Sequence, residues 1–384
     1  MQPDYRFIDA DNHYYEPVDR FLAYFDSGTL KEGFRVDDEN RLFVGDEPLY
    51  SGPESPMALP LTPGSHLELY TTMRMNAAVP TYDVPATEVP EFCSRDARLK
   101  VMDAQNVEAG IFYGSLGLLP EDQLAERKGP DLLYRHIRGY NRYAEEEWGF
   151  AHRNRIFAAP LLALDDLDRA LGELQDVLSR GARVIQLTPR PTIDRRSPGD
   201  PHFDPFWARV GEAGVLVAVH IGMNAYHYVQ QSGFWGENGL ASLAEWTPFQ
   251  RLIAMQDRPI MDFLGALILH GLFERHPKLR VLSVENSVSW LPYFARKLEQ
   301  VVDLPFSPIE TFKRHVYHTP VFTDDIRQAM DLVGDSQIVF GSDYPHPEGP
   351  AQPGQFLQHL EGVPETTAHK FLRATNAALL GLPV

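Results

Sequence analysis

Short apolar segments, rich in β-branched and aromatic residues, recur along the whole chain, and most are separated by stretches with helical spacing. Several of these segments are apolar on both faces, which is typical of parallel strands that are covered on both sides. The pattern predicts eight strands, at residues 6–11, 109–115, 156–164, 182–189, 215–222, 279–287, 316–322 and 337–345.

The segments between these strands carry helix start and stop signals. DDLDRALGELQDVLSRGA begins with Asp residues at a cap position, repeats Leu at helical intervals and stops at Gly181. DPFWARVGEAG ends at Gly214, directly before the fifth predicted strand. Eight alternating units of strand and helix favour an α/β fold of the (β/α)8 TIM-barrel type. An open, doubly wound sheet is the alternative, but no Gly-rich phosphate-binding turn follows the first strand.

One region interrupts the repeat after the first strand, at about residues 26–95. RVDDENRLFVGDEPLY predicts a small hairpin, and the Pro-rich segments that follow predict an extended excursion. We therefore expect residues 1–384 to form a single domain with an irregular Pro-rich insertion. This insertion and the loop at 226–259 are expected either to form walls of a pocket on the catalytic face or to make dimer contacts.

Composition narrows the range of partners. The chain has 384 residues and a net charge of −18, from 53 acidic and 35 basic residues, and it contains no long Lys/Arg cluster. Nucleic acid and anionic membranes are therefore not expected as partners. The sequence has no apolar run of 18 residues, no N-terminal secretory pattern and one cysteine, Cys93, so we expect a cytoplasmic protein without internal disulfides.

Side chains of the kinds that bind metals follow four of the predicted strands. They are Asp11 and His13 after the first, His220 after the fifth, Glu285 after the sixth and Asp343 after the eighth. Because barrel active sites form at the carboxyl ends of the strands, we expect these side chains to converge. Imidazole and carboxylate ligands suit Zn²⁺, Fe²⁺ or Mn²⁺, so the set predicts one or two divalent ions. Taken alone, each residue could instead be a hydrogen-bonded core or turn residue.

Four stretches of the sequence, IDADNH, VAVHIG, HGLFERHPKLRVLSVENSVSWLPY and FGSDYPHPEG, together resemble the metal-dependent amidohydrolase superfamily, and specifically its amidohydrolase-related, decarboxylase-like branch. His13, His220 and Asp343 match positions of metal ligands in that family. Asp11 stands where the family's first-strand pattern has its first His. The resemblance implies a TIM barrel, a divalent metal ion, a small-molecule substrate and a homodimer.

Two departures from the family's pattern bear on the reaction. Glu285 stands where the decarboxylating members carry a catalytic His, and the fourth predicted strand offers Gln186 in place of the bridging lysine of binuclear relatives. A carboxylate at position 285 could hold a second ion, which favours hydrolysis. We therefore predict a metal-dependent hydrolase, in which metal-bound hydroxide cleaves an amide, ester, lactone or thioester and Asp343 or Glu285 accepts the proton. The alternatives are a non-oxidative decarboxylase of an aromatic or unsaturated carboxylic acid, and a ligand-binding barrel without catalytic activity.

Three further residues are candidates for substrate contact. His346 lies three residues after Asp343, Arg190 follows the fourth predicted strand, and Tyr15 follows the first. Arg190 could bind a substrate carboxylate or phosphate, although a surface salt bridge is an equally good interpretation. Tyr15 could line an apolar pocket or belong to the core.

Overall fold

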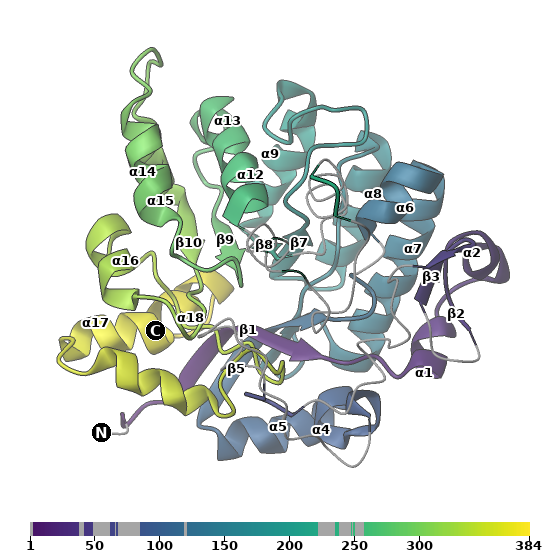
Figure 1. Ribbon diagram of the computed structural model, residues 1–384, viewed down its shortest axis with the longest axis horizontal. Helices are drawn as coiled ribbons and strands as arrows, with labels where there is room; N and C mark the ends of the chain where they lie inside the picture. The colour runs from purple at the N-terminus through teal and green to yellow at the C-terminus, as the bar shows by residue number, and fades with distance from the viewer. Residues whose placement is uncertain are drawn as a thin grey trace.

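The computed structural model describes residues 3–37, 42–48, 62–65, 67, 85–118, 121–221, 235–237, 247, 249 and 257–384. Figure 1 shows parallel strands in the centre of the molecule, with helices packed around the outside. This arrangement agrees with the mixed α/β fold that the alternation of apolar and helical segments predicts.

Two parallel sheets form the centre. The first has the order β1-β5-β6 and contains β1 (Phe7–Tyr14), β5 (Val107–Gly114) and β6 (Ile156–Ala158). The second has the order β10-β9-β8-β7 and contains β7 (Val184–Leu187), β8 (Leu216–His220), β9 (Val281–Val284) and β10 (Val316–His318). Each of these strands lies within or overlaps one of the first seven predicted segments.

The eighth predicted strand, at 337–345, is not a regular strand, and the prediction is wrong in that respect. Isolated parallel bridges nevertheless join this segment to both sheets, through Asn12 with Tyr344 and through His318 with Ile338. A third bridge connects the two sheets and pairs Leu161, which follows β6, with Gln186 of β7. The ladder is interrupted because Asp343 has a left-handed φ of 59°, which turns the chain out of the extended conformation.

Helices cover the outer faces of the sheets (Figure 1). Asp166 caps the helix after β6 by accepting a hydrogen bond from the Arg169 amide at 3.0 Å, as the Asp-rich start predicts. The helix before β8 ends at Gly214, whose φ is 63°. The α-helices are α1 (Val18–Leu22), α2 (Ser27–Glu32), α4 (Pro90–Cys93), α5 (Arg95–Ala104), α6 (Glu121–Lys128), α7 (Pro130–Tyr143), α8 (Leu167–Ser179), α9 (Asp204–Ala213), α12 (Asp257–Leu269), α13 (Leu272–Arg275), α14 (Leu291–Glu299), α15 (Pro308–His315), α16 (Ile326–Val333), α17 (Glu365–His369) and α18 (Thr375–Leu380). No helix in the described part of the chain is both long and apolar enough to cross a membrane.

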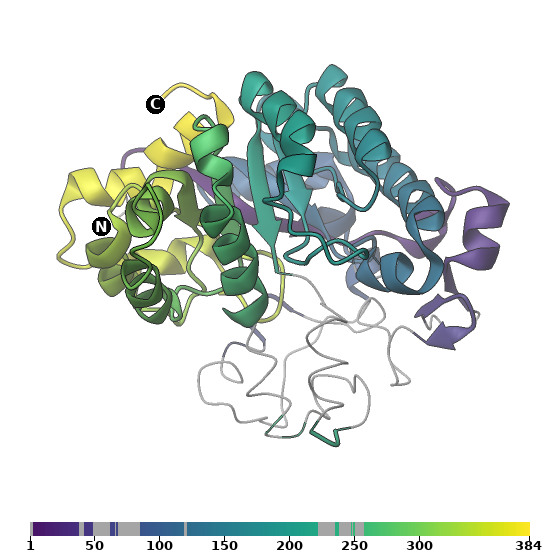
Figure 2. The same ribbon diagram turned by 90° about the horizontal axis from the view of Figure 1, so that it is seen from above.

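The region after β1 contains the predicted hairpin. β2 (Phe34–Val36) pairs antiparallel with β3 (Leu42–Val44), which pairs in turn with β4 (Glu47–Pro48). Figure 2 places this small sheet at the edge of the molecule, beside α2. Most of the predicted Pro-rich excursion and of the loop at 226–259 lies outside the described residues.

A buried amide joins the two ends of the chain. Asn376 lies on α18 with 1% of its surface exposed, and its Nδ2 donates hydrogen bonds to Ile8 O at 2.7 Å and Phe340 O at 3.0 Å. Ile8 belongs to β1 and Phe340 to the segment at 337–345. The side chain therefore holds the last segment of the fold against the first strand.

We expect Asn376→Ala to lower the free energy of unfolding by about 2 kcal/mol, because two buried hydrogen bonds are lost. Urea denaturation followed by circular dichroism measures the change. Gln358→Ala is the matched control, since that side chain is exposed and should change stability by less than about 0.5 kcal/mol. Equal stability of the two variants would show that the hydrogen bonds of Asn376 contribute little to the free energy of unfolding.

Candidate metal centre

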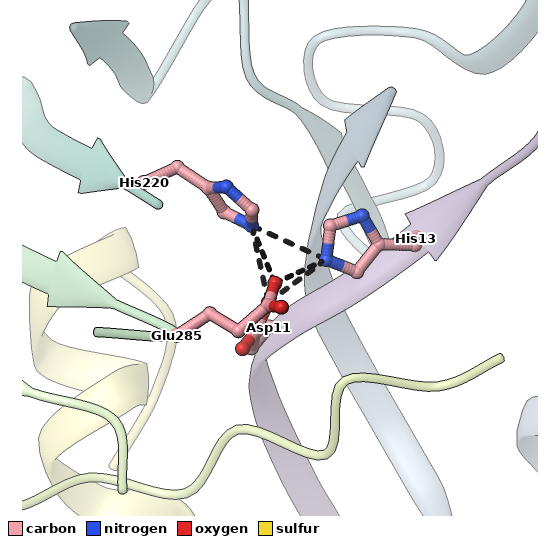
Figure 3. A group of neighbouring side chains, drawn as sticks. All are labelled: Asp11, His13, His220 and Glu285. Carbon is pink, nitrogen blue, oxygen red and sulfur yellow. Dashed lines mark hydrogen bonds and ion pairs between the residues drawn. The ribbon is translucent and has the colours of Figure 1, made fainter. Parts of the chain in front are cut away.

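Four side chains converge where β1, β8 and β9 end (Figure 3). The Nε2 atoms of His13 and His220 lie 3.2 Å apart. Asp11 Oδ1 lies 3.2 Å from the first of these nitrogens and 3.7 Å from the second. Glu285 Oε2 lies 3.4 Å and 3.2 Å from the same two atoms. Two nitrogens and two oxygens thus form a compact, nearly regular group.

These separations fit a bound metal ion. Ligands at about 2.1 Å from a tetrahedral ion lie about 3.4 Å from one another. The oxygens Asp11 Oδ1 and Glu285 Oε2 are buried and have no hydrogen-bond partner among the residues that the structure describes. Buried acceptors without donors are unfavourable unless a cation satisfies them. The donor set therefore fits a divalent ion, as the sequence predicts.

The orientation of His220 suits metal binding. Its Nδ1 lies 2.6 Å from the carbonyl oxygen of Ile221. Because a carbonyl can only accept, Nδ1 carries the proton, and in the neutral ring the lone pair is left on Nε2, which faces the group. Metal-binding histidines are commonly oriented by such a hydrogen bond.

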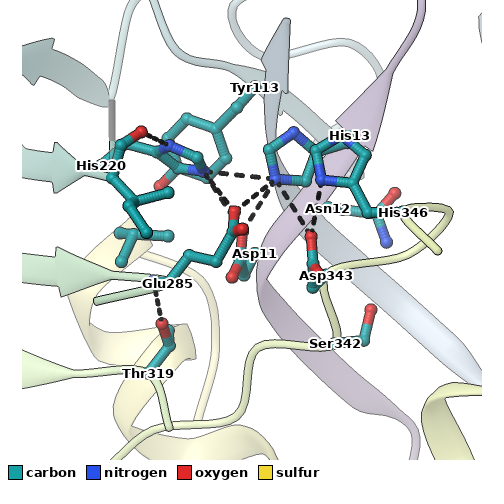
Figure 4. Close-up of polar contacts among 12 residues, drawn as sticks. Asp11, Asn12, His13, Tyr113, His220, Glu285, Thr319, Ser342, Asp343 and His346 are labelled. Atoms are coloured by element: carbon teal, nitrogen blue, oxygen red, sulfur yellow. Dashed lines mark hydrogen bonds and ion pairs between the residues drawn. The ribbon is translucent and has the colours of Figure 1, made fainter. Parts of the chain in front are cut away.

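Asp343 and His346 lie beside this group (Figure 4). Asp343 Oδ1 is 3.5 Å from His13 Nε2 and 2.8 Å from His346 Nδ1. The His346 ring stacks on the His13 ring with their centroids 3.8 Å apart. Asp343 and Glu285 both have a left-handed φ of 59°, a costly conformation for residues other than Gly. The backbone is thus bent at two strand ends where carboxylates enter the site.

The electrostatics reflect several carboxylates and imidazoles held close together in a largely buried site. Burial lowers the pKa of His220, but the neighbouring carboxylates of Asp11 and Glu285 outweigh it and raise the pKa to about 10. Burial raises the pKa of Glu285, but His13 and His220 outweigh it and lower the pKa. The pKa of Asp343 is raised well above its usual value by burial and by the charge of Glu285. A divalent cation would relieve the repulsion among the carboxylates.

A network behind the site fixes β1, and the sequence did not reveal it. Asp9 accepts hydrogen bonds from the Ser342 amide at 2.9 Å and from Asn12 Nδ2 at 2.9 Å. Arg98, buried on α5, donates to Asn12 Oδ1 and to His13 O. Strand alternation would place Asp9 on the same face as Asp11 and His13, but the register of β1 shifts between Asp9 and Asn12.

The predicted substrate residues fall in different places. The Tyr15 ring is buried, with its centroid 5.7 Å from that of His346. Arg190 Nη2 lies 2.6 Å from both Glu121 Oε1 and Asp165 Oδ2, two carboxylates outside the group of Asp11, His13, His220 and Glu285. Arg190 thus makes two salt bridges, which are buried rather than at the surface, and its role in substrate binding stays a prediction.

Two residues near the site were not identified from the sequence. Ser115 Oγ lies 3.2 Å from His346 Nε2. Burial and the charge of Glu285 raise the pKa of Glu348 to about 7. Glu348 lies in the same segment as Asp343 and His346, DYPHPEG. Its closeness in sequence to a predicted ligand is the signal that could have identified it as a site residue.

We expect a divalent ion, at a free concentration of a hundred times its dissociation constant, to raise the free energy of unfolding by about 2.7 kcal/mol. His13→Ala and His220→Ala should each remove most of this gain, because each deletes a ligand nitrogen. Thermal unfolding with and without Mn²⁺ or Zn²⁺ measures it. His202→Ala is the control, since that side chain is exposed. A gain that survives in both ligand variants would contradict the assigned centre.

Comparison with known proteins shows which family the chain belongs to. The sequence profile of the amidohydrolase family matches residues 8–382. The chain is 26% identical over 217 residues to the 2-amino-3-carboxymuconate-6-semialdehyde decarboxylase of Dictyostelium discoideum, a match that covers 54% of this chain and 55% of that protein, so it spans about half the length of the curated relative.

Solved structures agree with this result. An amidohydrolase from Mycobacterium avium subsp. paratuberculosis is 31% identical, with a TM-score of 0.89 and full coverage of both chains. A dihydroxybenzoic acid decarboxylase from a Polaromonas species, solved with bound manganese and the inhibitor 2-nitroresorcinol, shares the fold at 14% identity, with a TM-score of 0.56 and coverage of 98% and 97%. From the match over residues 8–382 and the likeness of the whole chain, we conclude that this protein belongs to the amidohydrolase family.

Proposed function

We propose that this protein is a metal-dependent, non-oxidative decarboxylase of a small aromatic or unsaturated carboxylic acid. The proposal rests on the group of nitrogen and oxygen donors that Asp11, His13 and His220 form at the strand ends. The chain belongs to the amidohydrolase family, and a curated protein that it resembles is a decarboxylase. The acyl hydrolase that the sequence predicts is the second candidate, because the relatives favour loss of CO₂.

Asp11, His13, His220 and Glu285 are proposed to hold one divalent ion, with Asp343 beside them. The manganese in the Polaromonas enzyme supports Mn²⁺ among the metals that such ligands accept. When bound, the ion supplies positive charge that can bind a substrate carboxylate and stabilise negative charge that develops on a neighbouring oxygen.

We propose that Glu348 supplies the proton. Breaking the bond between a carbon and its carboxylate releases CO₂ and leaves an electron pair on that carbon, which must then take up a proton. Glu348 is outside the proposed ligand set, and with a pKa raised to about 7 by burial and by Glu285 it can carry a proton at neutral pH. The neighbouring Tyr15 ring offers an apolar surface for an unsaturated substrate.

The convergence of these residues also supports the proposed architecture. Two parallel sheets and the segment at 337–345 are joined by bridges at Leu161, His318 and Asn12. We propose that these eight segments form one (β/α)8 barrel domain with an insertion after the first strand. In such a barrel, the carboxyl ends of all the strands face one site.

Hydrolysis remains the second candidate because of Glu285. The family resemblance places a catalytic His of the decarboxylases at this position, whereas here a carboxylate lies 3.2 Å from His220 Nε2. In a hydrolase, Asp343 or Glu285 would accept a proton from the attacking water.

The test is to incubate the metal-loaded protein with a panel of hydroxybenzoic and unsaturated carboxylic acids and to measure CO₂ release. A parallel panel of amides, esters, lactones and thioesters measures hydrolysis. We expect CO₂ release from at least one acid. Hydrolysis without CO₂ release would overturn the proposal in favour of the second candidate.

We expect Glu348→Gln to lower the rate of CO₂ release by about 100-fold, because the amide cannot deliver the proton. The metal content should be unchanged, since Glu348 is not a proposed ligand. Elemental analysis alongside the rate assay checks both statements, and His202→Ala serves as the control. An unchanged rate in Glu348→Gln would assign proton transfer to another group.

A further inference from the structure

A buried carboxylate binds the backbone of the loop that follows β5. Glu16 lies two residues after the end of β1, and its exposed fraction is 0%. Its Oε2 accepts hydrogen bonds from the amides of Ser115 at 3.2 Å and Leu116 at 2.9 Å, and its Oε1 accepts one from the amide of Gly117 at 3.1 Å. Three consecutive amides of one loop thus donate to a single side chain.

The pairing of β1 with β5 explains why Glu16 meets this loop. The two strands run parallel, and Tyr14 lies opposite Gly114 at their ends. The chain therefore leaves both strands side by side, and a side chain two residues beyond Tyr14 reaches the amides just beyond Gly114. The close approach requires glycine at position 114, because a Cβ atom there would lie 2.5 Å from Glu16 Oε1.

The loop at 115–117 is held strongly and from more than one side. Hydrogen bonds to a charged acceptor are stronger than those between neutral groups, and a buried amide that loses its acceptor is unfavourable. His136 Nε2 lies 2.7 Å from the carbonyl oxygen of Gly117, and the Ser115 hydroxyl donates to the carbonyl oxygen of Tyr14 at 3.1 Å. The amides of the loop, however, all depend on Glu16.

This loop reaches the candidate metal centre through Ser115. Ser115 Oγ lies 3.2 Å from His346 Nε2. At another edge of the same ring, Nδ1 lies 2.8 Å from Asp343 Oδ1, and the face of the ring stacks on His13. Figure 4 shows His346 in this position beside His13. The contact with Ser115 therefore joins the loop at 115–117 to a side chain that packs against the site.

We propose that Glu16 is a positioning residue for the reaction at this site. Its carboxylate fixes the loop at 115–117, and the loop fixes Ser115 against His346, so the ring keeps one orientation against His13. A catalytic arrangement loses rate steeply when one of its groups shifts by about 1 Å. The effect on rate rests on the proposed function, whereas the attachment of the loop is argued from geometry alone.

Hydrogen exchange of the full chain tests the attachment without any assay of activity. We expect the amides of residues 115–117 to exchange slowly in the unaltered protein and about tenfold faster in Glu16→Gln, because the amide side chain is neutral and keeps only one acceptor oxygen. The measurement is made at about pH 8, where the carboxylate is largely ionised, since burial raises the pKa of Glu16 to about 7.

Glu173→Gln is the matched control for hydrogen exchange. Glu173 is also a buried carboxylate, but it accepts from Asn141 Nδ2, so its change should leave the amides of 115–117 unaffected. Glu16→Asp keeps the charge on a shorter side chain and should exchange at an intermediate rate. Circular dichroism verifies that each variant is folded. Fast exchange of these amides in the unaltered protein, or equal exchange in Glu16→Gln and Glu173→Gln, would overturn the proposal.

A double-mutant cycle tests whether Glu16 acts through Ser115. We expect Glu16→Gln and Ser115→Ala each to lower the kcat of CO₂ release about tenfold, and Glu173→Gln to keep the full kcat. The double variant should be no slower than the slower single variant, because both changes remove the same contact.

The outcomes of the two experiments separate the proposals. A loss of about a hundredfold in the double variant would mean that Glu16 and Ser115 act independently, and it would overturn positioning through Ser115. An unchanged kcat in Glu16→Gln would do the same. Faster exchange in Glu16→Gln without CO₂ release by the unaltered protein would overturn only the proposed function, and CO₂ release with unchanged exchange only the role of Glu16.

Discussion

The structure depends on burying several like charges at one point. Asp11, Glu285 and Asp343 enter a space that His13 and His220 also occupy, and these side chains are largely shielded from water. Water cannot screen the repulsion in such a place, so a cation must offset it. The left-handed backbone at Glu285 and Asp343 adds a further cost. A fold that accepts both costs is organised around what the site binds.

The rest of the core keeps these groups in position. Arg98 is a buried cation, and burial lowers its pKa to about 10, yet it remains charged at neutral pH. It donates to Asn12 and to the carbonyl of His13, while Asp9 accepts from Ser342. These contacts join β1 to the segment that carries Asp343. The group of Asp11, His13, His220 and Glu285 is therefore held from behind by a second set of buried polar residues, which limits how far these side chains can move.

Much of the fold could be predicted from local pattern. Seven strands were located because apolar runs and flanking Gly or Asp signals are properties of short segments. The segment at 337–345 was expected to be a strand, since its apolar run reads like the others. Its backbone conformation at Asp343 depends on contacts between segments distant in sequence, such as the hydrogen bond from the Asp343 amide to the carbonyl oxygen of Asp11, and no local signal marks it.

The sequence by itself determined the chemistry that is available: Asp11, His13, His220, Glu285 and Asp343, each at the end of an apolar run. Only the tertiary structure decided how these groups meet. It brought Glu285 into the group of His13 and His220, placed His346 against Asp343, and engaged Arg190 with Glu121 and Asp165. The reason is physical: ligand type is a property of one residue, whereas distances and hydrogen-bond partners arise from contacts between residues far apart in the chain.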